Sequence, residues 1–313
     1  MSKNVKRQLP NPVKLAQLMR FRGPSLNRKK ARLTRAATIW DLRDIAKKRT
    51  PQGPFDYTDG AAESEASLDR ARQAFRDIEL VPNILRDVSD VDLTRNVFGV
   101  THQMPMGIAP TGFTRLMQTE GEIAGARAAE KFGIPFSLST LGTTSIEDVV
   151  KAAPSGDNWF QLYMWKDREG SMALVERARR AGVKTLHLTV DVPAAGHRLR
   201  DTYNGLTIPP TLTVKTLLNA IPRPAWWMNF LTTPAIEFAS MSSWNGTVAE
   251  LLDYMFDPTM TFEDLKWIRQ EWDGNLIVKG VQNLEDAKMA AKLGADAVLL
   301  SNHGGRQLDK API

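Results

Sequence analysis

Cysteine is absent from this chain of 313 residues, which excludes disulfides, thiolate nucleophiles and cysteine-ligated zinc or iron–sulfur centres. No apolar run reaches the roughly 18 residues that a membrane-spanning helix needs, and the N-terminus lacks the apolar core of a secretory signal. The four histidines lie far apart, without metal-ligand spacing, at His102, His187, His197 and His303. We therefore expect no metal site, and electron chemistry would need a cofactor.

Acidic residues are missing from the first 40 positions, which hold 11 Lys or Arg, whereas the remaining positions hold 30 basic and 35 acidic residues. The net charge of +6 is therefore a property of an N-terminal arm, which we assign to residues 1–37. Such an arm could be solvated or docked on its own protein. It could also contact a membrane surface, act as a targeting peptide or meet nucleic acid.

After the arm, short apolar strands alternate with amphipathic helices. We predict helices over residues 38–46 (capped by Thr38), 61–75, 119–132, 145–150, 170–181 and 283–293. We predict strands over residues 106–110, 135–139, 159–163, 185–191, 276–280 and 297–301. The strands are apolar nearly throughout, as expected of a parallel sheet covered on both faces, and parallel neighbours require crossover helices.

Polar residues gather at the C-terminal ends of nearly all these strands, among them Ser139, Thr189 and Ser301. A doubly wound sheet would concentrate its site at one switch point, so this distribution favours a (β/α)8 TIM barrel. The predicted domain covers residues 38–313 and supplies strands 1–6 of the eight. We therefore expect an α/β barrel that is incomplete at its C-terminal end.

The predicted barrel is interrupted by an insertion at about residues 200–260, which is too apolar for an ordinary linker. It contains Pro209-Pro210, Trp226-Trp227-Met228, Phe230-Leu231 and Trp244. Three alternatives remain open: packing against its own barrel, contact with a membrane through its tryptophans, or a lid over a site at the barrel mouth.

The segment Ser301–Asp309 carries the strongest chemical signal, since His303 and Arg306 follow a strand end with two glycines between them. His303 is the candidate base, because histidine titrates near neutral pH, and Asp191 could hold its imidazole. Arg306 and Arg198 are suited to binding a carboxylate.

Three further side chains complete the predicted constellation. Tyr57 and Tyr163 could hydrogen-bond a hydroxyl or carbonyl group, and Lys279 offers a positive charge to a group that becomes negative during reaction.

The chain resembles the FMN-dependent α-hydroxy acid dehydrogenases and oxidases. The resemblance covers roughly residues 38–313 and is most specific at Ser301–Gln307, which reads Ser-Asn-His-Gly-Gly-Arg-Gln. Other matching motifs are Phe55-Asp56-Tyr57, Gly60-Ala61-Ala62-Glu63, Ala109-Pro110-Thr111-Gly112, Gln161-Leu162-Tyr163, Thr189-Val190-Asp191-Val192-Pro193 with Arg198, and Val278-Lys279-Gly280. Phe256-Asp257-Pro258, the insertion and Ile268–Trp272 make it most similar to bacterial membrane-associated L-lactate dehydrogenases.

The resemblance implies a role for each matching residue. His303 would take a proton from a 2-hydroxy acid while two electrons reach FMN, and Asp191 would stabilise the imidazolium. Arg198 and Arg306 would bind the substrate carboxylate, with Tyr57 and Tyr163 on its hydroxyl side. The flavin would be lined by Pro110, Thr111, Gly112, Ser139, Gln161, Thr189, Lys279 and Ser301.

The resemblance further implies L-lactate as the substrate and a quinone or another membrane acceptor for the electrons. It implies a homotetramer, without nucleic acid, that is cytoplasmic or peripheral on the cytoplasmic face of the inner membrane. A 2-hydroxy acid oxidase and a mandelate-type dehydrogenase are alternatives. Leu141 stands where glycolate oxidases tend to carry Trp, which argues against glycolate.

The family's later Asp-Gly-Gly-x-Arg and Gly-Arg motifs, which hold the FMN phosphate, do not occur in the sequence. A truncated chain without activity is therefore a further alternative, and we expect residues 1–313 alone to be colourless and aggregation-prone.

Overall fold

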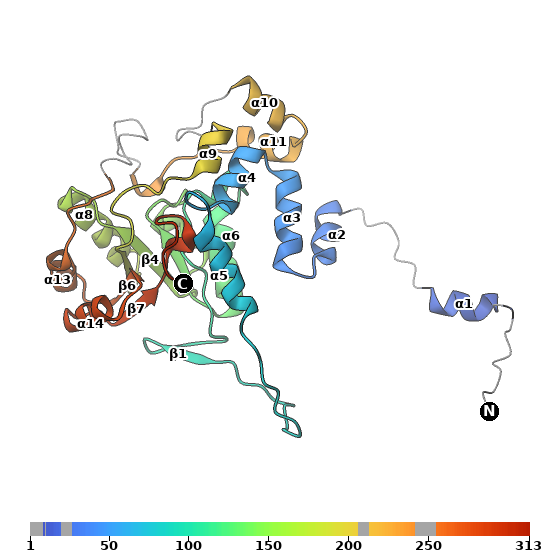
Figure 1. Ribbon diagram of the computed structural model, residues 1–313, viewed down its shortest axis with the longest axis horizontal. Helices are drawn as coiled ribbons and strands as arrows, with labels where there is room; N and C mark the ends of the chain where they lie inside the picture. Colours follow the sequence, from blue (N-terminus) through green and yellow to red (C-terminus); the bar gives the residue numbers. More distant parts are fainter. Residues whose placement is uncertain (1–8, 10, 20–26, 206–212, 242–254) are drawn as a thin grey trace. The chain divides into compact units, whose positions relative to one another are not determined.

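The computed structural model describes residues 9, 11–19, 27–205, 213–241 and 255–313 (Figure 1). The chain divides into two compact units, Met1–Ala46 and Lys47–Ile313. Three helices belong wholly or largely to the first unit: α1 (Pro12–Leu18), α2 (Arg28–Arg35) and α3 (Ile39–Arg49). Thr38 caps α3 as predicted, since its Oγ1 accepts a hydrogen bond from Asp41 N (3.2 Å) and Asp41 Oδ2 accepts one from Thr38 N (2.8 Å).

A parallel sheet of five strands forms the centre of the second unit, with every strand next to its neighbour in sequence. The strands are β3 (Phe136–Ser139), β4 (Asn158–Tyr163), β5 (Thr185–Thr189), β6 (Asn275–Val281) and β7 (Ala297–Leu300). The strand predicted at residues 106–110 is reduced to a single bridge between Ile108 and Phe136. This order never reverses, as expected of a βα barrel rather than a doubly wound sheet, although the sheet is not closed within the described residues.

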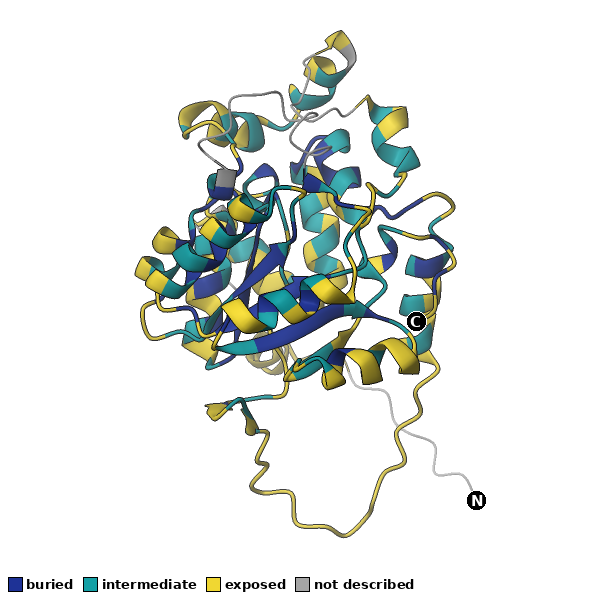
Figure 2. Cartoon of the chain, turned by 90° about the vertical axis from the view of Figure 1, so that its left-hand side faces the viewer, coloured by how far each residue is buried: buried dark blue, intermediate teal, exposed yellow. Residues whose placement is uncertain are grey.

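Five helices cover one face of this sheet: α6 (Gly121–Phe132), α7 (Ile146–Ala152), α8 (Arg168–Arg180), α13 (Phe262–Glu271) and α14 (Leu284–Lys292). Their inward side chains form one core with alternate strand residues, including Leu138, Phe160, Leu186 and Val278. Figure 2 shows this buried core between exposed helix surfaces. Four of these helices begin at the side-chain caps Ser145, Asp167, Thr261 and Asn283.

The opposite face of the sheet is largely polar, which corrects the prediction of strands that are apolar nearly throughout. Because side chains alternate along a strand, the residues between the core positions point the other way. They include Ser139, Gln161, His187, Thr189 and Lys279, all buried. Parallel register brings Tyr163 beside Thr189 and Thr189 beside Lys279. This face therefore places polar groups from successive strands next to one another.

The helix predicted over residues 61–75 is confirmed as α5 (Ala66–Arg76) over most of its length, but α5 begins later than predicted. Another helix, α4 (Gln52–Asp59), was not predicted, and a turn lies between the two. Backbone groups in the turn bond to distant segments, since Ala62 N donates to Gly305 O (2.9 Å) and Glu63 N to His197 O (2.8 Å). These tertiary hydrogen bonds replace the local ones that a continuous helix would need.

The remaining elements lie outside the alternation of barrel strands and helices. A small antiparallel hairpin joins β1 (Arg95–Val97) to β2 (Val100–His102), and short 3₁₀ turns occur at η1 (Thr114–Leu116), η2 (Ala239–Met241) and η3 (His303–Gly305). The insertion contains α9 (Leu199–Asn204), α10 (Val214–Ala220) and α11 (Pro224–Thr232). Pro209-Pro210 and Trp244 lie outside the described residues.

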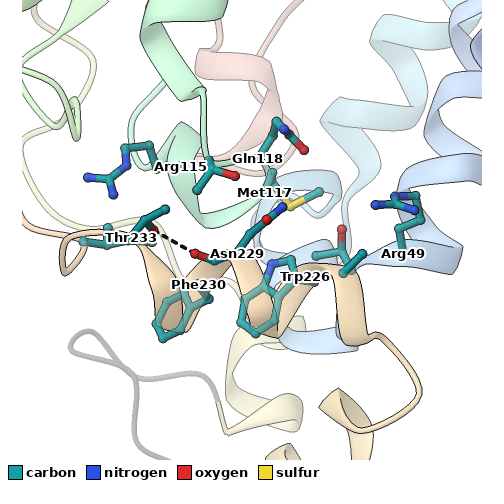
Figure 3. A pocket seen from close by; sticks show the side chains of 12 residues that line it. Arg49, Arg115, Met117, Gln118, Trp226, Asn229, Phe230 and Thr233 are labelled. Atoms are coloured by element: carbon teal, nitrogen blue, oxygen red, sulfur yellow. Dashed lines mark hydrogen bonds between the residues drawn. The ribbon is translucent and has the colours of Figure 1, made fainter. Parts of the chain in front are cut away.

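The insertion packs in part against the barrel domain. Trp226 Nε1 donates to Leu116 O (2.8 Å), and Arg115 Nη2 donates to Pro234 O (2.7 Å). Figure 3 shows Trp226, Asn229 and Phe230 of α11 around a pocket that Arg115 and Gln118 also line. Within the described residues, no helix is both long enough and apolar enough to cross a membrane.

Candidate active site

A histidine held between an acid and a phenol forms the centre of the candidate site. His303 Nδ1 lies 2.9 Å from Asp191 Oδ1, and His303 Nε2 lies 3.2 Å from Tyr163 Oη. A carboxylate can only accept, so the hydrogen resides on Nδ1 and leaves a lone pair on Nε2. Asp191 thus fixes the tautomer in which Nε2 can receive a proton.

The approach of Asp191 depends on a glycine in the neighbouring strand. A Cβ built at Gly280 would lie 2.6 Å from Asp191 Cβ, and Gly280 has φ +110°, which disfavours any other residue. Next to it, Lys279 Nζ lies 3.9 Å from Asp191 Oδ2. The end of β6 therefore supplies both a buried cation and the space that its acidic neighbour occupies.

Two guanidinium groups lie near one tyrosine ring. The Cζ atoms of Arg198 and Arg306 lie 5.3 and 5.2 Å from the centre of the Tyr57 ring. Arg306 Nη1 donates to Gly60 O (2.6 Å), which directs the side chain toward the turn after α4. Two cations held this close to each other favour binding of an anion such as a carboxylate.

The surroundings shift the titration of several of these groups. Burial raises the pKa of Tyr163, and the charge of Asp191 adds to the effect, so the side chain remains a phenol that can donate. Burial lowers the pKa of Lys279, partly offset by Asp191. Burial and the neighbouring charge of Arg198 lower the pKa of Arg306. The cations are thus poorly hydrated and would gain from an anionic ligand.

The predicted cofactor-lining residues come from the polar face of the sheet and from loops next to strand ends. Ser139, Gln161 and Thr189 lie on the polar face of the sheet, and Ser139 Oγ donates to Gln161 Oε1 (3.0 Å). Ser301 Oγ accepts from His303 N (3.0 Å), so it also supports the base. The segment Pro110–Gly112 packs beside the end of β3, since the adjacent Phe113 N donates to Leu141 O (3.0 Å).

Two buried polar atoms of this set have no hydrogen-bond partner among the described residues: Gln161 Nε2 and Thr189 Oγ1. Gln161 is 1% exposed and Thr189 is 3% exposed. An unpaired buried polar atom is costly, so both atoms fit a site that a polar cofactor completes.

Thr140 and Phe113 contribute to the site but escaped the sequence analysis. Thr140 Oγ1 accepts from Tyr163 N (3.1 Å) and donates to Gln161 O (2.5 Å), which positions two predicted residues at once. The Phe113 ring lies 6.3 Å from that of Tyr57. The hydroxyl pair Ser139-Thr140 at a strand end was a usable signal, whereas nothing local marked Phe113.

Comparisons with known proteins find a matching family and relatives along most of the chain. The model of the family described as FMN-dependent dehydrogenase matches residues 46–313. A Mycobacterium tuberculosis protein provisionally named L-lactate dehydrogenase is 58% identical over 309 residues, which are 99% of this chain and 75% of that protein. L-Lactate dehydrogenase of Yersinia pestis is 41% identical over 276 residues, 86% of this chain and 72% of that protein.

Solved structures of related enzymes share the fold of this chain. The monotopic membrane protein (S)-mandelate dehydrogenase matches with a TM-score of 0.85 and 38% identity, over 88% of this chain and 75% of that one. A mandelate oxidase matches with a TM-score of 0.74 and 35% identity, over 88% and 72%.

The residues present fit FMN, the cofactor of the matching family. The unpaired donors of Gln161 and Thr189 suit the carbonyl and ring-nitrogen groups of a flavin pyrimidine, and the buried Lys279 suits the edge that gains negative charge on reduction. These three side chains come from adjacent strands, which is the arrangement needed to grip one planar ring.

Proposed function

Because this chain belongs to the FMN-dependent dehydrogenase family, we propose that it oxidises L-lactate to pyruvate and passes the electrons to a quinone or another membrane acceptor. FMN, when bound, supplies the two-electron acceptor that the side chains lack. The observation that carries the proposal is His303, whose Nε2 lies beside Tyr163 while Nδ1 is held by Asp191. A base so placed can take the hydroxyl proton of a 2-hydroxy acid.

The roles of the other side chains follow from their positions. Arg198 and Arg306, which both lie near the Tyr57 ring, would hold the substrate carboxylate. Tyr163 would donate to the substrate oxygen, and Asp191 would stabilise the imidazolium once His303 Nε2 is protonated. Lys279, buried near Asp191, would balance negative charge that develops at the cofactor.

A substrate with an apolar side chain is favoured by the cluster next to these polar groups. Phe113, Phe238 and Met255 are buried together, and Leu141 and the two tyrosines pack against them. The methyl group of L-lactate would contact apolar side chains in this cluster, whereas glycolate has no side chain to bury there. Mandelate is the second candidate, since relatives named for mandelate share the fold.

Contact with a membrane is supported by the surface of the insertion. Helices α10 and α11 expose Val214, Leu217, Leu218, Ile221, Met228 and Leu231. Beneath them lies a cavity of about 460 Å³, lined mainly by apolar residues of α4, α10 and α11. An apolar surface without a partner is typical of interaction with lipid or protein, and a relative with the same fold is described as monotopic. A peripheral location on the membrane is therefore part of the proposal, and the homotetramer stays a prediction.

Anaerobic reduction of the flavin tests the function, in an FMN-loaded chain completed with the family's phosphate-binding motifs. We expect L-lactate to bleach the oxidised flavin spectrum faster than glycolate or (S)-mandelate, and H303Q to slow bleaching about 10²- to 10⁴-fold while keeping the flavin. Little hydrogen peroxide under air would separate the dehydrogenase from an oxidase. Absence of bleaching by all three acids would rule out the proposal.

A further inference from the structure

Asp309 ends the Ser301–Asp309 segment, and no function assigned so far involves it. Its side chain is 9% exposed and makes hydrogen bonds far along the sequence. Asp309 Oδ2 accepts from Ser64 N (3.1 Å) and from the Ser64 hydroxyl, and Oδ1 accepts from Ser67 N (3.0 Å). One carboxylate therefore joins the loop after β7 to the start of α5.

Helix α5 depends on this distant acid for its N-terminal cap. The residue at its own N-cap position, Glu65, has φ +62° and makes no side-chain capping bond. Asp309 accepts from the backbone of Ser67, in the first turn, where a negative charge also interacts favourably with the helix dipole. Hydrogen bonds from Ser64 and Ser67 lower the pKa of Asp309 to about 2, so the cap is ionised at neutral pH.

The loop that Asp309 anchors is conformationally strained. His303 has φ +60°, and Gly304 and Gly305 follow with φ +65° and +72°. A left-handed non-glycine residue costs free energy and persists only where its surroundings hold it. Some of that support is visible, since Gly305 O accepts from Ala62 N and a Cβ at Gly305 would lie 2.8 Å from Leu68 N.

The same turn leads back into α4, which carries Tyr57. Residues 60–67 thus lie between one substrate-binding side chain and the loop that bears two others. Arg306 Nη1 already bonds to Gly60 O in this turn. A shift of the loop relative to the turn would therefore move His303 and Arg306 relative to Tyr57.

We propose that Asp309 is a positioning residue, which fixes the His303–Arg306 loop against the turn between α4 and α5 and so sets the geometry of substrate binding and proton transfer. The assignment rests on the proposed function for its kinetic consequences. A misplacement on the order of 1 Å can cost about 10²-fold in rate.

The test compares D309N with S145A in the FMN-loaded protein. S145A removes a helix cap of the same kind, the exposed bond from Asp148 N to Ser145 Oγ at the start of α7, which involves no residue of the proposed site. We expect D309N to lower kcat/KM for L-lactate about 100-fold, with a raised KM as Arg306 loses its position. We expect S145A to leave kcat/KM and KM unchanged, although its loss of thermal stability should be similar to that of D309N.

A second variant and a second measurement keep the test decisive if D309N folds poorly. S64A removes one donor to the same carboxylate and is expected to lower kcat/KM roughly threefold. Amide hydrogen exchange, which needs no turnover, should accelerate in residues 301–309 of S64A and D309N but not of S145A.

Three results would overturn the assignment: wild-type kinetics in D309N, equal slowing in S145A, or unchanged exchange in residues 301–309. The failure of the proposed function is recognised separately. It would show as absence of flavin reduction in the unaltered protein, and the exchange measurement would then decide on Asp309 alone.

Discussion

His187 is a buried histidine that the proposed reaction does not use. It lies on the polar face of β5, where its Nδ1 is 3.4 Å from Ser137 Oγ and its ring is 5.2 Å from that of Trp159. Its Nε2 has no hydrogen-bond partner. Burial, and secondarily the charge of Lys279, lowers the pKa of His187 to about 4. The protein therefore holds this imidazole neutral.

The linkage between folding and protonation of His187 makes a testable prediction. An unfolded histidine has a pKa of about 6.5, so between pH 6.5 and 4 the unfolded chain binds a proton that the folded chain does not. This contribution to stability is complete above about pH 6.5 and is lost as the pH falls toward 4, by roughly 3 kcal/mol in total.

Urea unfolding of the wild type, H187Q and H197Q at pH 7 and pH 5 measures this contribution. The free energy of unfolding should fall less with pH in H187Q than in the wild type. His197 is exposed, so H197Q should retain the wild-type slope. Equal slopes in all three proteins would contradict the assignment.

Among individual residues, the sequence predicted that several candidate side chains would lie close together, and they do. His303, Asp191 and Tyr163 lie at strand ends or just beyond them, and a parallel sheet brings such ends together. Asp309 was part of the motif but received no role, because its partners Ser64 and Ser67 are more than 240 positions away. Contacts of that kind are set by the tertiary fold.

Among the structural elements, the end of β6 restricts substitution in two ways at once. Gly280 combines φ +110° with the close approach of Asp191, whereas Gly182, in the turn after α8, has φ +88° and no atom within 4 Å of its Cβ position. Substitution at Gly182 would therefore test the cost of the positive φ alone, whereas substitution at Gly280 would add a steric clash to that cost.

We expect G280A to lose stability and also activity, because an added Cβ pushes Asp191 away from His303. G182A should lose about 1 kcal/mol of stability with kcat unchanged, since only the positive φ is disfavoured. Thermal melts together with flavin-reduction rates check both. An active G280A enzyme would show that Asp191 tolerates displacement.

Strands and most helices of the barrel domain were predicted because apolar runs and caps such as Ser145 and Asn283 are local signals. Helix α4 and the late start of α5 were missed because the contacts that shape the turn between them come from distant residues. Arg200 of α9 donates to Asp59 and Glu65, and Ala62 N bonds to Gly305 O. In the insertion, the spacing of apolar residues did not repeat with the period of a helix, so α9–α11 could not be located from the sequence.

For the whole molecule, the proposed membrane contact has two candidate surfaces. The basic arm belongs to the first compact unit, and the exposed apolar face of α10 and α11 belongs to the second. A basic segment binds anionic lipid by charge and releases it in salt, whereas an apolar face binds by burial.

We expect a protein lacking residues 1–35 to sediment still with vesicles, and the double variant L217S/L231S to sediment less. Both side chains are exposed, so the substitutions should leave flavin reduction by L-lactate unchanged. Vesicles with and without anionic lipid, at low and high salt, provide the comparison. Loss of binding only in the deletion would assign the contact to the arm.

The hydrogen bonds from Ser64 to Asp309 span 245 positions, and the bond between Tyr163 and His303 spans 140. Contacts so distant in sequence form slowly, because loop closure must precede any gain from them. Each β–α unit can acquire its helix and strand early, but the proton-accepting site exists only after residues near position 60 meet those near 305. In a refolding experiment, catalytic activity should therefore return later than helical structure, which makes the recovery of turnover a measure of completed topology.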